Sequence, residues 1–209
     1  MKYFLIILCI LSGAASLNAV AANASPPSGA VRVFGDSISS GYGLPPGSGW
    51  VSLLSKRLQE RAPSHPVVNA SISGDTTSSG LARIEQSLQT HRPEIVIIEL
   101  GGNDGLRGSS IDSISRNLET LIESCHRRHA KVLLVGMHLP PNYGATYTQK
   151  FQEIFPHLAK KHQIKVVPFL LQGFGDQREF FLADGIHPNV QAQEKILENV
   201  WPILRGMIK

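Results

Sequence analysis

The chain has 209 residues, of which 42% are hydrophobic and 17% are charged, and its formal net charge is +4 at pH 7. This length and composition suffice to bury one core and are not typical of disordered or fibrous proteins. The longest basic run, His126-Arg127-Arg128-His129, carries no interleaved aromatic residues, so the positive charge indicates a solvated surface. We therefore expect one globular domain and no nucleic-acid partner.

The first residues predict a secretory signal peptide. Lys2 precedes an apolar stretch over residues 3–11, and small residues follow with A-x-A patterns at 19–21 and 22–24. The alternative is a retained membrane anchor, but the apolar stretch is short for a membrane span. We expect residues 1–24 to be removed by cleavage near 21–24. The mature domain, residues 25–209, would then be periplasmic or secreted, without stable insertion in a membrane.

Cleavage would remove Cys9 and leave Cys125 as the remaining cysteine. A single cysteine forms no internal disulfide, so the fold must depend on its core even in an oxidising compartment. Cys125 falls on the apolar face of a predicted helix. We therefore interpret it as a buried structural thiol and not as a second nucleophile.

After a short leader rich in Ser, Pro and Gly, apolar runs alternate with segments of helical periodicity. Strands are predicted at 30–34, 66–70, 94–100, 131–136 and 164–168, and helices at 49–61, 81–88, 111–125, about 145–162 and about 190–205. This alternation implies right-handed crossovers and a parallel sheet between two layers of helices, an α/β fold. Because ligands bind beyond the carboxyl ends of such strands, the segments around Ser37, Gly74 and Asn103 should share one edge.

The first strand runs into Phe34-Gly35-Asp36-Ser37-Ile38-Ser39, which places one hydroxyl at the rim of the sheet. We interpret Ser37 as a candidate catalytic nucleophile. A serine hydroxyl needs a base, a group that orients the base, and donors for a developing oxyanion. The rest of the chain must supply these groups if the interpretation is right.

A candidate base lies close to the C-terminus. Asp184-Gly185-Ile186-His187-Pro188 places a carboxylate three residues before an imidazole, in a loop restricted by glycine and proline. A carboxylate bonded to one ring nitrogen of His187 leaves the other nitrogen free to accept the serine proton. Taken alone, the same pattern also fits a turn at a helix entry with an ordinary surface histidine.

Candidate oxyanion donors follow other predicted strands. They are the backbone N–H groups of Ser37 and Gly74 and the side-chain amide of Asn103. Each could separately be turn chemistry, because Gly and Asn are common turn residues. The occurrence of all these segments at strand ends, or at the entry to the last helix, favours a common site.

Together these segments resemble the Ser, Gly, Asn and His blocks of the SGNH (GDSL) hydrolases. The blocks are Gly35-Asp36-Ser37, the Gly74 loop, Gly101-Gly102-Asn103-Asp104 and Asp184-Gly185-Ile186-His187-Pro188. Longer strings at 69–76, 99–108 and 139–144 resemble the periplasmic branch of multifunctional acyl-CoA thioesterases, lysophospholipases and arylesterases. The resemblance extends over residues 31–202. One departure is Ile38, where the family motif has leucine.

The resemblance implies a flavodoxin-like, three-layer α/β/α sandwich with a five-stranded parallel sheet. It implies Ser37 as nucleophile, His187 as general base and Asp184 as its orienting acid. Ser37, Gly74 and Asn103 would form the oxyanion hole. It implies neither a metal nor an organic cofactor, and it implies small acyl esters, thioesters or lysophospholipids as substrates.

Two alternative functions remain at this stage, a short-chain or carbohydrate acetyl esterase and a non-catalytic acyl- or glycan-binding module. A long acyl chain needs a continuous apolar groove, to which we expect Leu106, Leu139, Tyr143 and Ile186 to contribute. The stretch 169–175 matches the family branch least well and could also line that groove. Glu99 and Asp104 are interpreted as supports of the site loops and not as catalysts.

Overall fold

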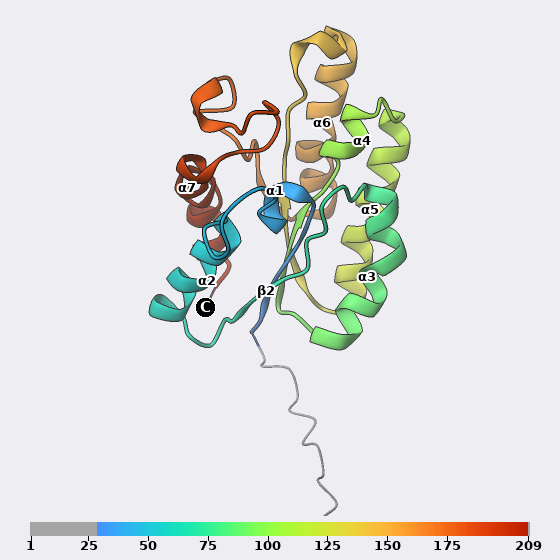
Figure 1. The fold of residues 1–209 in the computed structure, drawn as a ribbon. Coiled ribbons are helices and arrows are strands. Elements are labelled where there is room, and N and C mark those ends of the chain that lie inside the picture. The colour runs from blue at the N-terminus through green and yellow to red at the C-terminus, as the bar shows by residue number, and fades with distance from the viewer. Residues whose placement is uncertain (1–28, 209) are drawn as a thin grey trace, which may run out of the picture.

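A computed structural model describes residues 29–208 of the chain (Figure 1). The predicted signal peptide and its cleavage site lie outside these residues. Within the described part of the chain, no helix is both long enough and apolar enough to cross a membrane.

The centre of the molecule is a five-stranded, entirely parallel sheet with the order β2-β1-β3-β4-β5. Its strands are β1 (Val31–Gly35), β2 (Val67–Asn69), β3 (Ile95–Glu99), β4 (Lys131–Val135) and β5 (Lys165–Val167). All five residues of β3 are buried, as expected of a β-branched strand that is covered on both faces. The strand order is that of the flavodoxin-like fold, so the predicted parallel α/β sandwich is confirmed.

Two groups of helices cover the two faces of the sheet (Figure 1). Helices α2 (Trp50–Arg61) and α7 (Gln193–Arg205) pack against each other on one face. On the other face, α5 (Ile111–Arg127) packs between α3 (Thr77–His91) and α6 (Ala145–His162). These are the helices that the periodicity predicts, and the sheet and its two helix layers form the three-layer sandwich.

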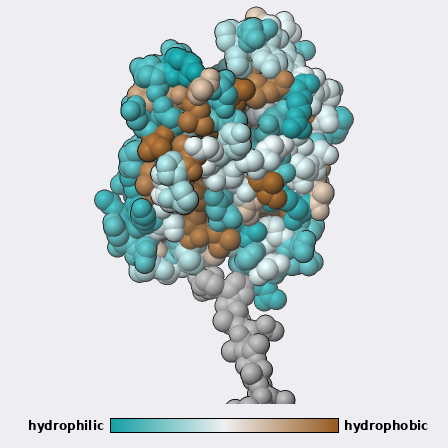
Figure 2. Space-filling view, in the orientation of Figure 1, coloured by the Kyte–Doolittle hydropathy of each residue, from teal (hydrophilic) through white to brown (hydrophobic). Residues whose placement is uncertain are grey.

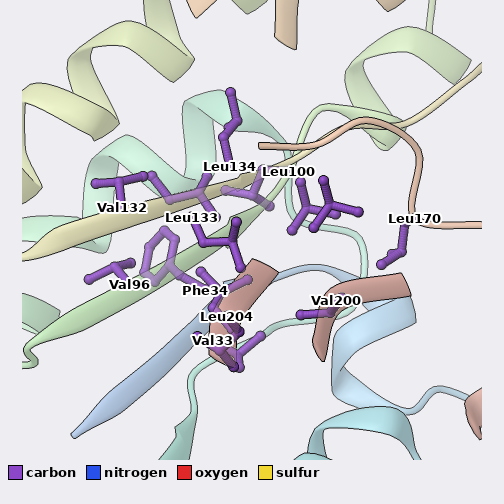
Figure 3. Packing of buried hydrophobic residues seen from close by; sticks show 14 of the residues in the cluster. Val33, Phe34, Val96, Leu100, Val132, Leu133, Leu134, Leu170, Val200 and Leu204 are labelled. Carbon is purple, nitrogen blue, oxygen red and sulfur yellow. The ribbon is translucent and has the colours of Figure 1, made fainter. Parts of the chain in front are cut away.

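The core lies between the sheet and these helix layers (Figure 3). Alternate residues of a strand face opposite layers, so Val33 faces the layer opposite to that of Phe34, whose ring contacts the α3 side. Cys125 on α5 is completely buried and unpaired, as predicted. Burial raises the pKa of its thiol to about 12, which keeps it protonated and unreactive.

Two short helices that the periodicity does not predict follow the ends of β1 and β3. Helix α1 (Ser37–Ser40) follows β1, and α4 (Gly102–Leu106) follows β3.

The predicted helix at 81–88 begins earlier in the structure, at Thr77, because Thr76 and Ser79 form a reciprocal capping box. Residues 190–192, predicted as the start of the last helix, instead form the 3₁₀ helix η3 (Val190–Ala192). Two further 3₁₀ helices are η1 (Pro141–Tyr143) and η2 (Arg178–Phe180).

Candidate active site

Ser37 is the first residue of α1, directly beyond the carboxyl end of β1. Asp36 caps the helix, because its Oδ1 accepts a hydrogen bond from the backbone N–H of Ile38 at 3.0 Å. Gly35 permits this tight exit from the strand, since a Cβ there would lie 2.6 Å from Glu99 Oε2. The strand and the cap therefore hold the Ser37 hydroxyl at the sheet edge.

The structure brings His187 and Asp184 to Ser37 from 150 residues away. His187 Nε2 lies 2.9 Å from Ser37 Oγ, and His187 Nδ1 lies 2.7 Å from Asp184 Oδ2. The other carboxylate oxygen of Asp184 accepts the backbone N–H groups of Ile186 and His187 at 2.9 and 3.0 Å. A carboxylate at Nδ1 places the ring proton there and leaves the Nε2 lone pair facing the serine hydroxyl.

The hydrogen bonds around Asp184 also fix its charge. The backbone N–H of His187 and then its ring lower the pKa of Asp184 to about 2. Asp184 is therefore an anion at every pH at which His187 could act as a base. This is the electrostatic condition for a carboxylate that stabilises an imidazolium.

Two residues outside the predicted motifs help to position the loop of residues 181–188, which contains Asp184 and His187 and is called the histidine loop below. Arg178 donates to the carbonyl groups of Phe181, Leu182 and Ala183, at 3.1, 2.6 and 2.9 Å. The ring of Tyr42 lies against the imidazole of His187, with centroids 4.6 Å apart. A polar side chain that binds loop carbonyls, and an aromatic ring from another loop, leave no periodic or spacing signal in the sequence.

Asn103 lies beside Ser37 because β1 and β3 are neighbours in the sheet. Its Nδ2 donates to Asp36 Oδ2 at 3.1 Å and to the carbonyl of Asp75 at 2.9 Å. Gly74 has a left-handed backbone, with φ of 84°, which favours glycine. Ser37 and Asn103 line one cavity, whereas Gly74 does not line it and adjoins Asn103 through Asp75.

Glu99 and Asp104 make the supporting contacts that the sequence interpretation assigns to them. Asp104 accepts both the backbone N–H and the hydroxyl of Thr77, at 2.8 and 2.6 Å, and so joins α4 to the start of α3. Glu99 is 2% exposed and accepts the Ser39 hydroxyl at 2.6 Å. Burial and the neighbouring Asp36 raise the pKa of Glu99 well above its ordinary range.

A cavity of about 980 Å³ opens beside the Ser37 hydroxyl. The predicted groove residues Leu106, Leu139 and Ile186 line it. Tyr143 does not, and that prediction is wrong: its hydroxyl instead donates to the Leu106 carbonyl at 3.0 Å. The space-filling view shows apolar surface at the upper end of the molecule, between the loop before α7 and the α6 side (Figure 2).

The loop at 169–175 provides another wall of this cavity. Phe169 lines it and stacks on the ring of His138, with centroids 3.9 Å apart and planes 6° apart. Burial lowers the pKa of His138, which favours the neutral form of the imidazole in this stack. Gly175 packs closely beneath, since a Cβ there would lie 2.9 Å from the Phe169 ring. The cavity is thus a largely apolar groove that ends at the Ser37 hydroxyl.

Within residues 29–208, one group of histidine and acidic side chains is close enough to hold a metal ion, formed by Glu119, Glu123 and His162. It lies on α5 and α6 and contains none of the residues around Ser37. Glu119 is already paired with Lys161 and His162.

Comparison with known proteins agrees with this geometry. The model of the GDSL-like Lipase/Acylhydrolase family matches residues 33–195. Esterase TesA of Pseudomonas aeruginosa is 47% identical over 84% of this chain and 88% of its own length. Thioesterase 1/protease 1/lysophospholipase L1 of Escherichia coli K12 is 39% identical over 79% of this chain and 78% of its own.

The fold comparison agrees with the sequence comparison. A crystal structure of TesA superposes with a TM-score of 0.82 at 46% identity, covering 85% of this chain and 98% of the other. The architecture is therefore that of a hydrolase with an α/β fold, and the hydroxyl, imidazole and carboxylate at Ser37 are arranged as a serine hydrolase requires. The chain belongs to the GDSL-like lipase/acylhydrolase family.

Proposed function

We propose that this hydrolase cleaves carboxylic ester and thioester bonds through an acyl-enzyme, with Ser37 as nucleophile, His187 as general base and Asp184 as orienting acid. The observation that carries the proposal is the continuous hydrogen-bonded series from Asp184 Oδ2 through the imidazole of His187 to Ser37 Oγ. Each of the two distances is within hydrogen-bond reach.

In acylation, Ser37 Oγ attacks the carbonyl carbon of the substrate, and its proton moves to Nε2 of His187. The bond from that carbon to the leaving oxygen or sulfur then breaks. His187 gives the proton to the leaving alcohol or thiol, and the acyl group remains esterified to Oγ. Asp184 stabilises the imidazolium throughout, because it stays anionic.

In deacylation, a water molecule takes the place of the leaving group. His187 Nε2 removes a proton from the water, and the resulting hydroxide attacks the acyl carbon. The bond to Ser37 Oγ breaks, and His187 returns the proton to the serine. The products are a carboxylic acid and the free enzyme, so the reaction balances with water as its second reactant.

Both half-reactions pass through a tetrahedral intermediate with a negative oxygen. We assign its donors to the backbone N–H groups of Ser37 and Gly74 and the side-chain amide of Asn103. Support comes from the position of Asn103 beside Asp36, the neighbour of Ser37, and from its hydrogen bond to the carbonyl that follows Gly74.

The substrates that fit the groove are acyl esters, acyl thioesters and lysophospholipids with an extended hydrocarbon chain. The volume of the cavity, about 980 Å³, is at the upper end of the range for ligand pockets, and its walls are largely apolar. The names of the TesA esterase and of the thioesterase/lysophospholipase describe activities of this kind for those relatives. An acetyl esterase would require no groove of this size.

We also propose that residues 1–24 are a signal peptide and that residues 25–209 act as one domain in the periplasm or outside the cell. Sequencing the N-terminus of the protein recovered from the periplasmic fraction tests this. A mature N-terminus between residues 22 and 25 would support the proposal, and an uncleaved chain in the membrane fraction would reject it.

The proposed activity is tested with p-nitrophenyl esters and acyl-CoAs of two to sixteen carbons, using residues 25–209 and the Ser37→Ala variant. We expect the parent protein to hydrolyse medium or long chains faster than acetyl esters and the variant to lose turnover. A strong preference for acetyl would favour the acetyl esterase. Absence of turnover in the parent, with retained ligand binding, would favour the binding module.

A further inference from the structure

The Asn103 amide is fully engaged before any substrate arrives. An amide nitrogen carries two protons, and Nδ2 donates both, to Asp36 Oδ2 and to the Asp75 carbonyl. These two acceptors fix which end of the amide faces Ser37. An oxyanion must share one of these protons. The position and charge of the Asp36 carboxyl therefore determine how the Asn103 amide is oriented to donate to the oxyanion.

Asp36 is held in turn by the buried end of β3. Its backbone N–H donates to Glu99 Oε2 at 3.3 Å, and a side-chain hydrogen bond to Glu99 is among the interactions that lower the pKa of Asp36 against its burial. In the sheet register, Gly35 pairs with Glu99, which brings the two acids together. A hydrogen bond between two carboxyl groups requires a proton on one of them, because two carboxylates are both acceptors.

The surroundings indicate which acid carries this proton. Both acids are buried, at 2% exposed for Glu99 and 3% for Asp36. Asp36 accepts at both of its oxygens, from the N–H of Ile38 and from the amide of Asn103, which stabilise its charged form. Glu99 accepts the Asp36 N–H and the Ser39 hydroxyl at one oxygen, Oε2. Burial raises the pKa of both acids, to about 6 for Asp36 and well above the ordinary range for Glu99. Glu99 is therefore the neutral partner and Asp36 the anion.

We propose that Glu99 is a positioning residue of the reaction: as a neutral acid it donates to the Asp36 carboxylate, which in turn holds the Asn103 amide in place for the oxyanion. The inference rests on the oxyanion role proposed above for Asn103. Glu99 itself does not line the substrate cavity, so it acts through Asp36 and Asn103.

Two substitutions at Glu99 separate a donor from a space-filling residue. Glu99→Gln keeps a carbonyl for the Ser39 hydroxyl and an N–H for Asp36, so it should retain kcat to within about threefold. Glu99→Leu keeps similar volume without a donor, and it should lower kcat about 10- to 100-fold while KM changes less than about threefold. Leu118→Ala, in the buried face of α5, is the control for lost stability with unchanged kcat.

A double-mutant cycle shows whether Glu99 acts through Asn103. In an Asn103→Ala background, Glu99→Leu should cost less than about twofold in kcat. Equal losses in both backgrounds would overturn the proposal. It would also fail if Glu99→Gln lost as much activity as Glu99→Leu, or if Asn103→Ala left kcat unchanged.

A measurement without turnover separates this inference from the proposed function. The Asn103 side-chain amide signals, identified in a ¹⁵N–¹H spectrum by their loss in Asn103→Ala, should shift in Glu99→Leu and stay in place in Glu99→Gln. Identical spectra in both variants would overturn the role of Glu99 even in an active enzyme. A parent protein without esterase activity would instead reject the proposed function, and the spectra would still decide the contact.

Discussion

The loss of activity in acid should depend on His187 and not on Asp184. Acidification should lower kcat/KM as His187 becomes protonated, because an imidazolium cannot accept the serine proton. Asp184 cannot cause this loss, since its hydrogen bonds hold its pKa at about 2. A pH profile of p-nitrophenyl ester hydrolysis checks this, and activity that stays flat on acidification would contradict the role of His187 as a base.

The same shift in Asp184 predicts a pH-dependent stability. A carboxyl whose pKa is lowered on folding stabilises the protein above its ordinary value of 3.8, and this contribution is lost as the pH falls toward about 2. We expect the melting temperature of the parent to fall between pH 4 and pH 2. Part of that fall should be missing in Asp184→Asn, and equal slopes in the two proteins would contradict the prediction.

Asn103 gives a direct test of the oxyanion assignment. Asn103→Ala removes one donor and should lower kcat by about 10²–10³-fold, with a far-ultraviolet circular dichroism spectrum like that of the parent. Lys150→Ala is a suitable control, because Lys150 is exposed on α6 and does not line the cavity. If the two substitutions have the same small effect, Asn103 does not bind the oxyanion.

Strand β1 contains a buried arginine that should lower the stability of the fold. Arg32 is 7% exposed, and its Nε and Nη1 have no hydrogen-bond partner within residues 29–208. Burial, and then the neighbouring Arg83, lower the pKa of its guanidinium. A buried guanidinium with two nitrogens that lack acceptors has a free-energy cost that an apolar side chain of similar length does not have.

We therefore expect Arg32→Met to raise the free energy of unfolding by about 1–2 kcal/mol, measured by urea denaturation. The matched control is Arg57→Met, because Arg57 pairs with Glu194 and Glu198 at 2.6 and 2.7 Å. That substitution should not stabilise the protein. A loss of stability in Arg32→Met would show that the guanidinium has a favourable role in β1.

The long elements could be predicted because their apolar residues repeat with a clear period. Helix α5 keeps Ile114, Leu118 and Leu121 on one buried face, and β3 is apolar almost throughout. Helices α1 and α4 could not be predicted in this way. They have four and five residues, and they form because Asp36 caps one and Gly101, with φ of 112°, begins the other.

That Ser37, Asp184 and His187 lie together could be predicted from the sequence, whereas the contacts that hold them in place could not. Ser37, Asp184 and His187 lie in motifs whose spacing follows from the chemistry. The Asp36–Glu99 contact depends on the register of β1 against β3, which a local pattern does not specify. The misplacement of Tyr143 has a similar cause, since its ring direction is set by tertiary packing and its hydroxyl bonds the Leu106 carbonyl.

At the scale of the whole molecule, Cys125 reports on the integrity of the core. Its thiol is completely buried on α5, so a thiol reagent can reach it only when the core opens. In the mature chain we expect almost no reaction with Ellman's reagent under native conditions and one reactive thiol in concentrated urea. Rapid reaction of the native protein would mean that α5 separates from the sheet far more easily than its packing indicates.

The attachment of the histidine loop has a consequence for how heat should inactivate the enzyme. Residues 183–186 are mostly exposed, and much of the loop's support comes from the Arg178 side chain and a single β-bridge between Phe181 and Pro188. Amide protons there should exchange with deuterium much sooner than those of β3, because the loop can open without disturbing the sheet. The enzyme would then lose its activity reversibly at temperatures at which its core is still folded.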